Sequence, residues 1–72
     1  MASGTELQIL RIIRDDGGET TPALVSRKLG SSWGIDYIRL LCNSLGRDDY
    51  IDVLKSGKLI ITAKGMQAIG DK

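Results

Sequence analysis

The chain has 72 residues, of which 42% are hydrophobic and 26% are charged, so it has room for one core and no second one. Ten Lys and Arg against nine Asp and Glu leave a net charge of +1, which excludes a polybasic tail and an acidic disordered segment. With no His and a single Cys, the composition excludes a disulfide framework, the usual zinc sites and every Ser/His or Cys/His catalytic arrangement.

The first predicted element is a helix near the start of the chain. Thr5 and Gln8 have the spacing of a capping box, and Leu7, Leu10 and Ile13 then recur at helical spacing. The acidic and glycine-rich run 15–18 ends this pattern. We therefore expect a helix that begins at Thr5 and is buried on a broad side.

A second helix is predicted over residues 22–29. Thr21 can accept a hydrogen bond from a free amide of the first turn, and Pro22 at the first helical position lacks only a donor that would have no partner. The apolar residues expected to face the core are Leu24, Val25 and Leu29. The short segment 19–20 before this helix could pair as an edge strand.

A third helix is predicted over residues 35–46. Its core face is formed by apolar side chains at helical spacing, namely Ile35, Ile38, Leu41, Cys42 and Leu45. The opposite face carries mostly polar side chains, namely Asp36, Arg39, Leu40, Asn43 and Ser44, with Tyr37 at the flank. A polar helix face of this kind is the first feature of the sequence that points to a function.

The period changes after residue 49. Residues 50–54 and 59–61 are rich in β-forming side chains, and the segment 55–58 between them contains the Ser-Gly pair of a tight hairpin. Thr62 is then placed to cap a short last helix over residues 63–69. The expected order is therefore helix, helix, helix, hairpin, short helix, in a single domain over residues 1–72.

The same sequence indicates where the protein resides. Its longest apolar runs are a few residues, far below the roughly 20 needed to cross a bilayer. Residues 1–5 lack the charged-then-apolar design of a signal peptide. The unpaired Cys42 fits a reducing compartment, where a thiol packs as a small apolar residue. We expect a cytoplasmic protein with no enzyme activity, metal, cofactor or membrane contact.

In this order, four segments resemble the winged helix-turn-helix domains of bacterial and archaeal transcription regulators. Residues 21–30 are similar to the second helix with its glycine turn, and residues 37–45 to the recognition helix. Residues 50–51 are similar to the strand that follows, and residues 60–65 to the strand-Thr-x-Lys-Gly ending after the wing. The resemblance implies an α+β fold, a winged helix. Its parts would be a three-helix bundle with a helix-turn-helix, a β-hairpin wing and a short C-terminal helix. Asp48 and Asp49 stand where these domains commonly carry Gly before the strand, and Asp tolerates the left-handed conformation.

The resemblance also implies a function, which is to bind double-stranded DNA as a transcriptional regulator. Helix 35–46 would enter the major groove, and the hairpin tip 55–58 would lie on the flanking backbone. The residues expected at this interface are Thr21, Ser31, Ser32, Tyr37, Arg39, Leu40, Asn43, Lys55 and Lys58. Among them, Arg39 could contact guanine and Asn43 adenine. Lys55 and Lys58 would bind phosphates, unless they only keep an exposed hairpin soluble.

The distribution of charge agrees with this interface. Residues 20–47 carry four basic side chains and one acidic one, whereas residues 1–19 carry two basic and four acidic ones, and residues 48–72 balance. The positive excess therefore lies on the predicted helix-turn-helix, where phosphates need cations.

A second hypothesis is a protein-interaction module within a larger complex. Leu40 and Asp36 lie in the middle of the predicted DNA-binding face, and the total charge is nearly neutral. An apolar side chain can also contact a thymine methyl group, so both hypotheses stay open. Regulators of this class usually bind DNA as dimers across two half-sites, so a homodimer is a further prediction.

Overall fold

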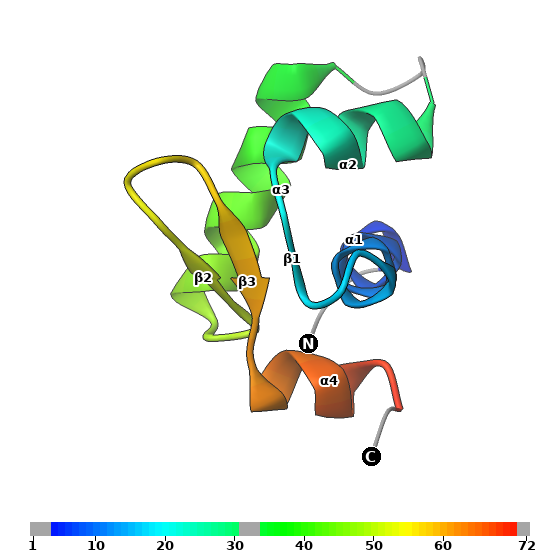
Figure 1. Cartoon of the computed structure of the whole chain (residues 1–72), viewed down its shortest axis with the longest axis vertical. Helices are drawn as coiled ribbons and strands as arrows, with labels where there is room; N and C mark the ends of the chain where they lie inside the picture. Colours follow the sequence, from blue (N-terminus) through cyan, green and yellow to red (C-terminus); the bar gives the residue numbers. More distant parts are fainter. Residues whose placement is uncertain (1–3, 31–33, 71–72) are drawn as a thin grey trace.

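The computed structural model describes residues 4–30 and 34–70, and over these residues the chain forms four helices and one small antiparallel sheet (Figure 1). In chain order the elements are α1 (Gly4–Asp15), β1 (Glu19–Thr20), α2 (Pro22–Leu29), α3 (Ile35–Arg47), β2 (Ile51–Val53), β3 (Leu59–Ile61) and α4 (Ala63–Ala68). The expected α+β class and the expected order of elements are confirmed.

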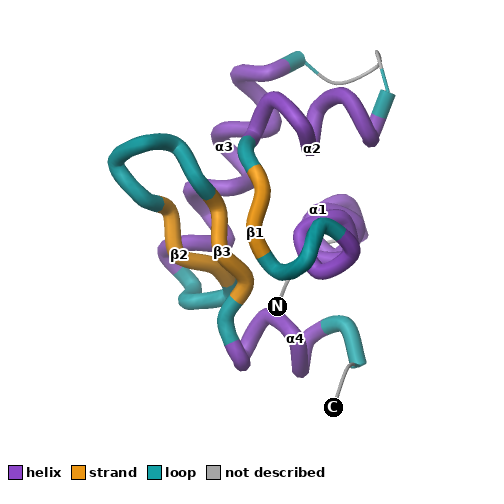
Figure 2. Tube along the Cα trace, viewed as in Figure 1, coloured by secondary structure: helices purple, strands orange, loops and turns teal. Residues whose placement is uncertain are grey.

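The sheet joins segments that are far apart in the sequence. Its strand order is β1-β3-β2, so β3 is the central strand (Figure 2). Thr20 of β1 and Val53 of β2 both pair with Leu59 of β3, from opposite sides. The predicted edge strand at residues 19–20 is therefore confirmed, and it attaches the hairpin to the chain between α1 and α2.

The core lies between the helices and the inner face of this sheet. Its buried apolar side chains come from five elements and are Ile9, Leu10, Ile13, Val25, Ile38, Cys42, Leu45, Ile51 and Leu59. Among the predicted core residues of the first and third helices, Leu10, Ile13, Ile38, Cys42 and Leu45 are buried, and Leu7 and Leu41 pack partly buried against them. Ile35, which was also predicted to face the core, is only partly buried and does not belong to this cluster. One prediction for α2 is wrong, because Leu24 is 37% exposed. Val25 and Leu29 are four residues apart and share one helix face, whereas Leu24 is about 100° away from Val25.

The hairpin has a three-residue loop at positions 55–57. The Leu54 amide donates to the Lys58 carbonyl at 2.9 Å, and the Gly57 amide donates to the Leu54 carbonyl at 2.9 Å. Gly57 has φ 94°, a left-handed conformation that glycine adopts without steric cost. The expected tight hairpin is confirmed, and its loop presents Lys55 and Ser56 to solvent.

At the other end of the hairpin, side chains after β3 hold the turn before β2. We call Thr62, Lys64, Gly65 and the 48–50 segment the C-terminal clasp. The Thr62 hydroxyl donates to the Asp49 carbonyl at 2.6 Å and accepts from the Gly65 amide at 3.1 Å, so one side chain caps α4 and binds the turn. Of the two Asp residues that stand where Gly is common, Asp49 adopts the left-handed conformation, with φ 67°, and Asp48 does not, with φ −91°.

Lys64 and Gly65 complete the clasp. The Lys64 ammonium donates to the Asp48 carbonyl at 2.8 Å and lies 4.8 Å from the centroid of the Tyr50 ring. Gly65 is buried, and a Cβ at this position would lie only 2.2 Å from the Tyr50 carbonyl oxygen. The Thr-x-Lys-Gly ending therefore has a structural reason: each of its three named residues contacts the same turn.

Several predicted boundaries differ from the structure by one or two residues. Helix α1 already includes Gly4, so Thr5 lies inside the helix and does not precede it as a cap. Helix α3 continues to Arg47, one residue beyond its predicted end, and β2 is shorter than the predicted strand 50–54. Glycine at position 46 does not end α3, because its amide and its neighbours stay within the helical hydrogen-bond pattern.

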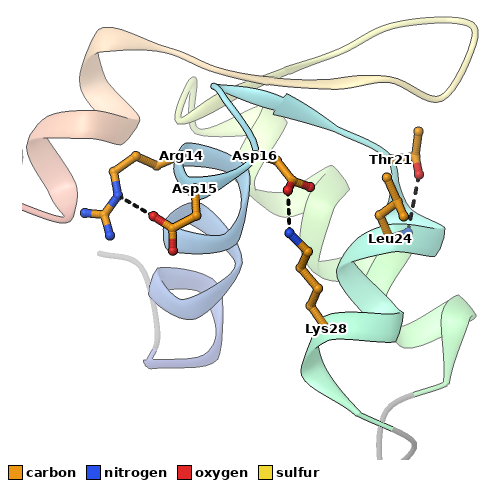
Figure 3. A network of polar contacts seen from close by, with 6 residues as sticks. All are labelled: Arg14, Asp15, Asp16, Thr21, Leu24 and Lys28. Carbon is orange, nitrogen blue, oxygen red and sulfur yellow. Dashed lines mark hydrogen bonds and ion pairs between the residues drawn. The ribbon is translucent and has the colours of Figure 1, made fainter.

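A polar contact joins the end of α1 to α2 (Figure 3). The Lys28 ammonium, from the last turn of α2, donates to a carboxylate oxygen of Asp16, which follows α1. This hydrogen bond holds the pKa of the Asp16 carboxyl below its ordinary value. Lys28 is thus engaged in holding two helices together, although it belongs to the positively charged part of the sequence.

Candidate nucleic-acid interface

The exposed side of α3 carries the side chains that the sequence singled out. Asp36, Arg39 and Asn43 are exposed, and Leu40 between them is 63% exposed. Buried Ile38, Cys42 and Leu45 hold the opposite side of the helix in the core. Because the buried residues all lie on one side of α3, helical periodicity directs the opposite, polar side to solvent.

This side of α3 lies between two other elements. Helix α2 packs against α3 on one flank and β2 packs against it on the other. Figure 1 shows the hairpin beside α3, with its loop on the side of the sheet away from α4. We call the exposed residues of α3 named above, together with the hairpin loop 55–57 and Lys58, the helix–hairpin face.

An open-sided pocket of about 150 Å³ lies where these elements meet. It is lined by Arg39, Cys42 and Asn43 of α3, Pro22 at the start of α2, and Val53, Gly57 and Leu59 of the hairpin. Two predicted site residues, Arg39 and Asn43, are therefore brought to the same place as the hairpin. The sequence pattern did not identify Pro22, Val53 and Gly57 as neighbours of this site, because their contact with α3 depends on how the elements pack.

Thr21 lies next to this pocket through its neighbour Pro22. Its side chain is the cap of α2, accepting a hydrogen bond from the Leu24 amide at 3.3 Å (Figure 3). The predicted capping role is confirmed. A threonine hydroxyl that accepts one hydrogen bond still has its own proton to donate. Thr21 can therefore cap the helix and bind an anion at the same time.

The two hairpin lysines, which the sequence treated alike, have different surroundings. Lys58 lies 3.5 Å from the Glu19 carboxylate of β1, measured from Nζ to Oε1, and both side chains are about half exposed. Lys55 is exposed at the loop, and within residues 4–30 and 34–70 no carboxylate pairs with it. Glu19 is a neighbour that the sequence did not predict, because the contact depends on the register between β1 and β3.

The remaining predicted site residues are placed as follows. Tyr37 is 42% exposed at the flank of α3, as expected. Ser31 and Ser32, expected to bind phosphate before α3, lie outside the described residues. Arg39 differs from Lys28 and Lys58 because no carboxylate in the described part of the chain forms an ion pair with it. Its guanidinium charge is therefore available to a ligand.

Cys42 is one of the residues that line the pocket, but its thiol is not in the reactive form. Its side chain is 1% exposed, and burial raises the pKa of the thiol to about 11. A thiol with this pKa is protonated at neutral pH, and the thiolate is the nucleophilic form. The predicted packing role of Cys42 is confirmed by its burial.

Across the described ranges 4–30 and 34–70, no cluster of three or more Cys, Asp or Glu side chains is placed to hold a metal ion. In the same ranges, no helix has the length and apolar character to cross a bilayer. No family model, curated protein or solved structure matches this chain. The helix–hairpin face is therefore the feature of the molecule that indicates a function.

Proposed function

We propose that the chain is a winged helix-turn-helix domain that binds double-stranded DNA as a transcriptional regulator. The order of elements supports this proposal: β1 lies between the first two helices, α3 precedes the hairpin, and the strand order is β1-β3-β2. In such a domain α3 is the recognition helix and the hairpin is the wing. We assign the major groove to α3 and the flanking backbone to the loop at 55–58.

One observation carries the proposal. Arg39 and Asn43 are exposed on one helix, next to the hairpin, and both border the same pocket. Arg donates two parallel hydrogen bonds to the O6 and N7 acceptors of guanine, and Asn pairs in the same way with adenine. Leu40 is suited to contact a thymine methyl group. These side chains have the chemistry to contact base edges from a single helix.

Phosphate binding would come from the borders of this face. Thr21 at the start of α2 has a hydroxyl proton to donate, and Lys55 is an exposed cation at the hairpin loop. The modest excess of positive charge over residues 20–47 predicts weak binding to DNA of arbitrary sequence. High affinity would then require the base contacts of Arg39 and Asn43.

The first test is a salt titration with duplex DNA of random sequence. We expect micromolar or weaker binding that falls steeply as the salt concentration rises, because each phosphate contact releases cations from the DNA. A fluorescence anisotropy titration at low salt that detects no binding would contradict the proposal. Arg11 is exposed on α1, outside the face, so Arg11→Ala is the control for substitutions of Arg39.

A second candidate function is supported by a specific observation. Leu40 is 63% exposed, more than any other large apolar side chain among the described residues, and it lies one helical turn from Asp36. Exposed apolar side chains at the centre of a polar rim are typical of protein interfaces. An NMR chemical-shift map with duplex DNA separates the two functions. Shifts confined to α3 and the hairpin favour DNA, whereas an unchanged spectrum favours a protein partner.

A further inference from the structure

The outer face of the sheet carries two carboxylates at equivalent positions. Glu19 of β1 and Asp52 of β2 both pair with Ile60 of the central strand, one from each side. Residues directly opposite one another in an antiparallel sheet share a face, so both carboxylates lie on the side away from the core. Both are exposed, whereas the inward-facing neighbours Thr20 and Leu59 are buried.

Lys58 lies on this same outer face, because it precedes Ile60 by two positions along the chain. It is therefore a diagonal neighbour of both Glu19 and Asp52. Of the two carboxylates, Glu19 forms the ion pair, at 3.5 Å, and the contacts of the described residues give no such pair to Asp52. Glu19 and Asp52 are thus equivalent in register, but among the described contacts only Glu19 is paired with Lys58.

We propose that Glu19 is an internal counter-charge that lowers the affinity for DNA by competing with phosphate for the ammonium group of Lys58. This inference rests on the proposed DNA-binding function. A phosphate that binds Lys58 must displace a carboxylate that is already in place. The protein therefore gains less from a phosphate contact at this lysine than it would from a lysine without a partner.

The competition affects one kind of contact only. Phosphate contacts carry no sequence information, whereas Arg39 and Asn43 are suited to bind base edges. Glu19 lies on β1, and no contact in the described structure links it to either of these residues. Weakening the phosphate contact therefore lowers the affinity for all duplex sequences by about the same factor and leaves the base contacts unchanged.

The ion pair is exchangeable, which this role requires. The Lys58 and Glu19 side chains are 46% and 55% exposed, so water and salt screen their attraction. Exposed pairs of this kind are weak, and removing the carboxylate is expected to raise affinity for random duplex DNA by about two- to fivefold. The slope of log K against log salt would become steeper by up to about 0.9, the value of one phosphate contact.

The test compares Glu19→Gln with Asp52→Asn. Each substitution removes one negative charge from the same face of the sheet, but only the first removes a partner of Lys58. We expect Glu19→Gln to raise the affinity for random duplex DNA and steepen the salt slope, and Asp52→Asn to have less than half of this effect. In a Lys58→Ala background, Glu19→Gln is expected to cause no increase beyond that of Asp52→Asn.

Three results would overturn the inference. Equal effects of Glu19→Gln and Asp52→Asn would mean that only total charge matters, and an undiminished effect of Glu19→Gln without Lys58 would mean that the ion pair is irrelevant. No increase in either variant would mean that Lys58 does not contact phosphate. In each of these cases the wild-type protein still binds DNA. Absence of wild-type binding at low salt would instead overturn the proposed function together with this inference. Thermal melts of all variants confirm that each is folded.

Discussion

The C-terminal clasp and the helix–hairpin face lie at opposite ends of the same hairpin and contain similar side chains. In the clasp, Thr62 and Lys64 bind backbone carbonyls of the 48–50 segment. In the helix–hairpin face, Arg39 and Lys55 form no ion pair with any described carboxylate. A basic side chain whose partner is in the fold stabilises the protein, whereas one without such a partner is available to a ligand. The difference separates cations that hold the fold together from cations that are free for a ligand, and Lys58, which pairs with Glu19 on the helix–hairpin face, stands between the two.

The largest effect is expected from Gly65→Ala in the clasp. The added Cβ would lie 2.2 Å from the Tyr50 carbonyl oxygen and 2.8 Å from Cγ1 of Ile61, so the backbone of the turn or of α4 must move. We expect the free energy of unfolding to fall by about 2 to 4 kcal/mol, as in other overpacked sites. Urea denaturation measures this change. Gly4→Ala is the control, because its Cβ meets nothing within 4 Å and alanine favours helix.

A pair of substitutions tests the comparison directly. Arg39→Ala is expected to lower the affinity for duplex DNA about tenfold, through the loss of a guanidinium contact, with little change in stability. Lys64→Ala is expected to leave DNA affinity within about twofold and to lower the free energy of unfolding by at most about 1 kcal/mol. Anisotropy titrations give the DNA affinity of each variant, and denaturation curves give its free energy of unfolding. If Lys64→Ala lost DNA affinity as strongly as Arg39→Ala, the two regions would not differ in function.

A loss of stability about half that of Gly65→Ala is expected from Thr62→Ala. This substitution removes the cap of α4 and the hydrogen bond to the Asp49 carbonyl, which we expect to cost about 1 to 2 kcal/mol of stability. Thr62→Ser keeps the hydroxyl and is expected to recover most of that loss. Equal stability of the alanine and serine variants would show that the hydroxyl is not the group that holds the clasp.

The smallest effect is the pH dependence of the contact between Asp16 and Lys28. The pKa of Asp16 is lowered in the folded protein, so its contribution to stability is present above the unfolded pKa of about 3.9 and is lost as the pH falls through the folded pKa. Asp16→Asn is therefore expected to be less stable than the wild type at pH 6, with a difference that disappears in strong acid. Lys28→Met should remove the same pH dependence. An unchanged difference at pH 2 would contradict this account.

Features that depend on residues close together in the sequence were predicted, whereas contacts between residues far apart in the sequence were not. The helix over 22–29 with its Thr21 cap, the core side of α3 and the glycine in the hairpin loop were all predicted. Each follows from local rules, namely helical periodicity, capping and the left-handed conformation. The prediction that Leu24 faces the core was wrong, because Val25 and Leu29 occupy the inward face of α2 and Leu24 lies about 100° away from that face. The candidate side chains Arg39 and Asn43 were found from their face of the helix.

The sequence by itself therefore determined the α+β class, the order of the elements and which side of α3 is polar, since these depend on residues a few positions apart. The tertiary structure decided that Arg39 and Asn43 border a pocket with the hairpin, and that Lys58 pairs with Glu19 from 39 positions earlier in the chain. It also decided that Lys64 belongs to the clasp. Such contacts join elements that meet only when the sheet places β1 and β2 on either side of β3. The hairpin loop sets the register of β2 with β3 locally, whereas β1 pairs with a strand far along the chain, and no local pattern encodes that pairing.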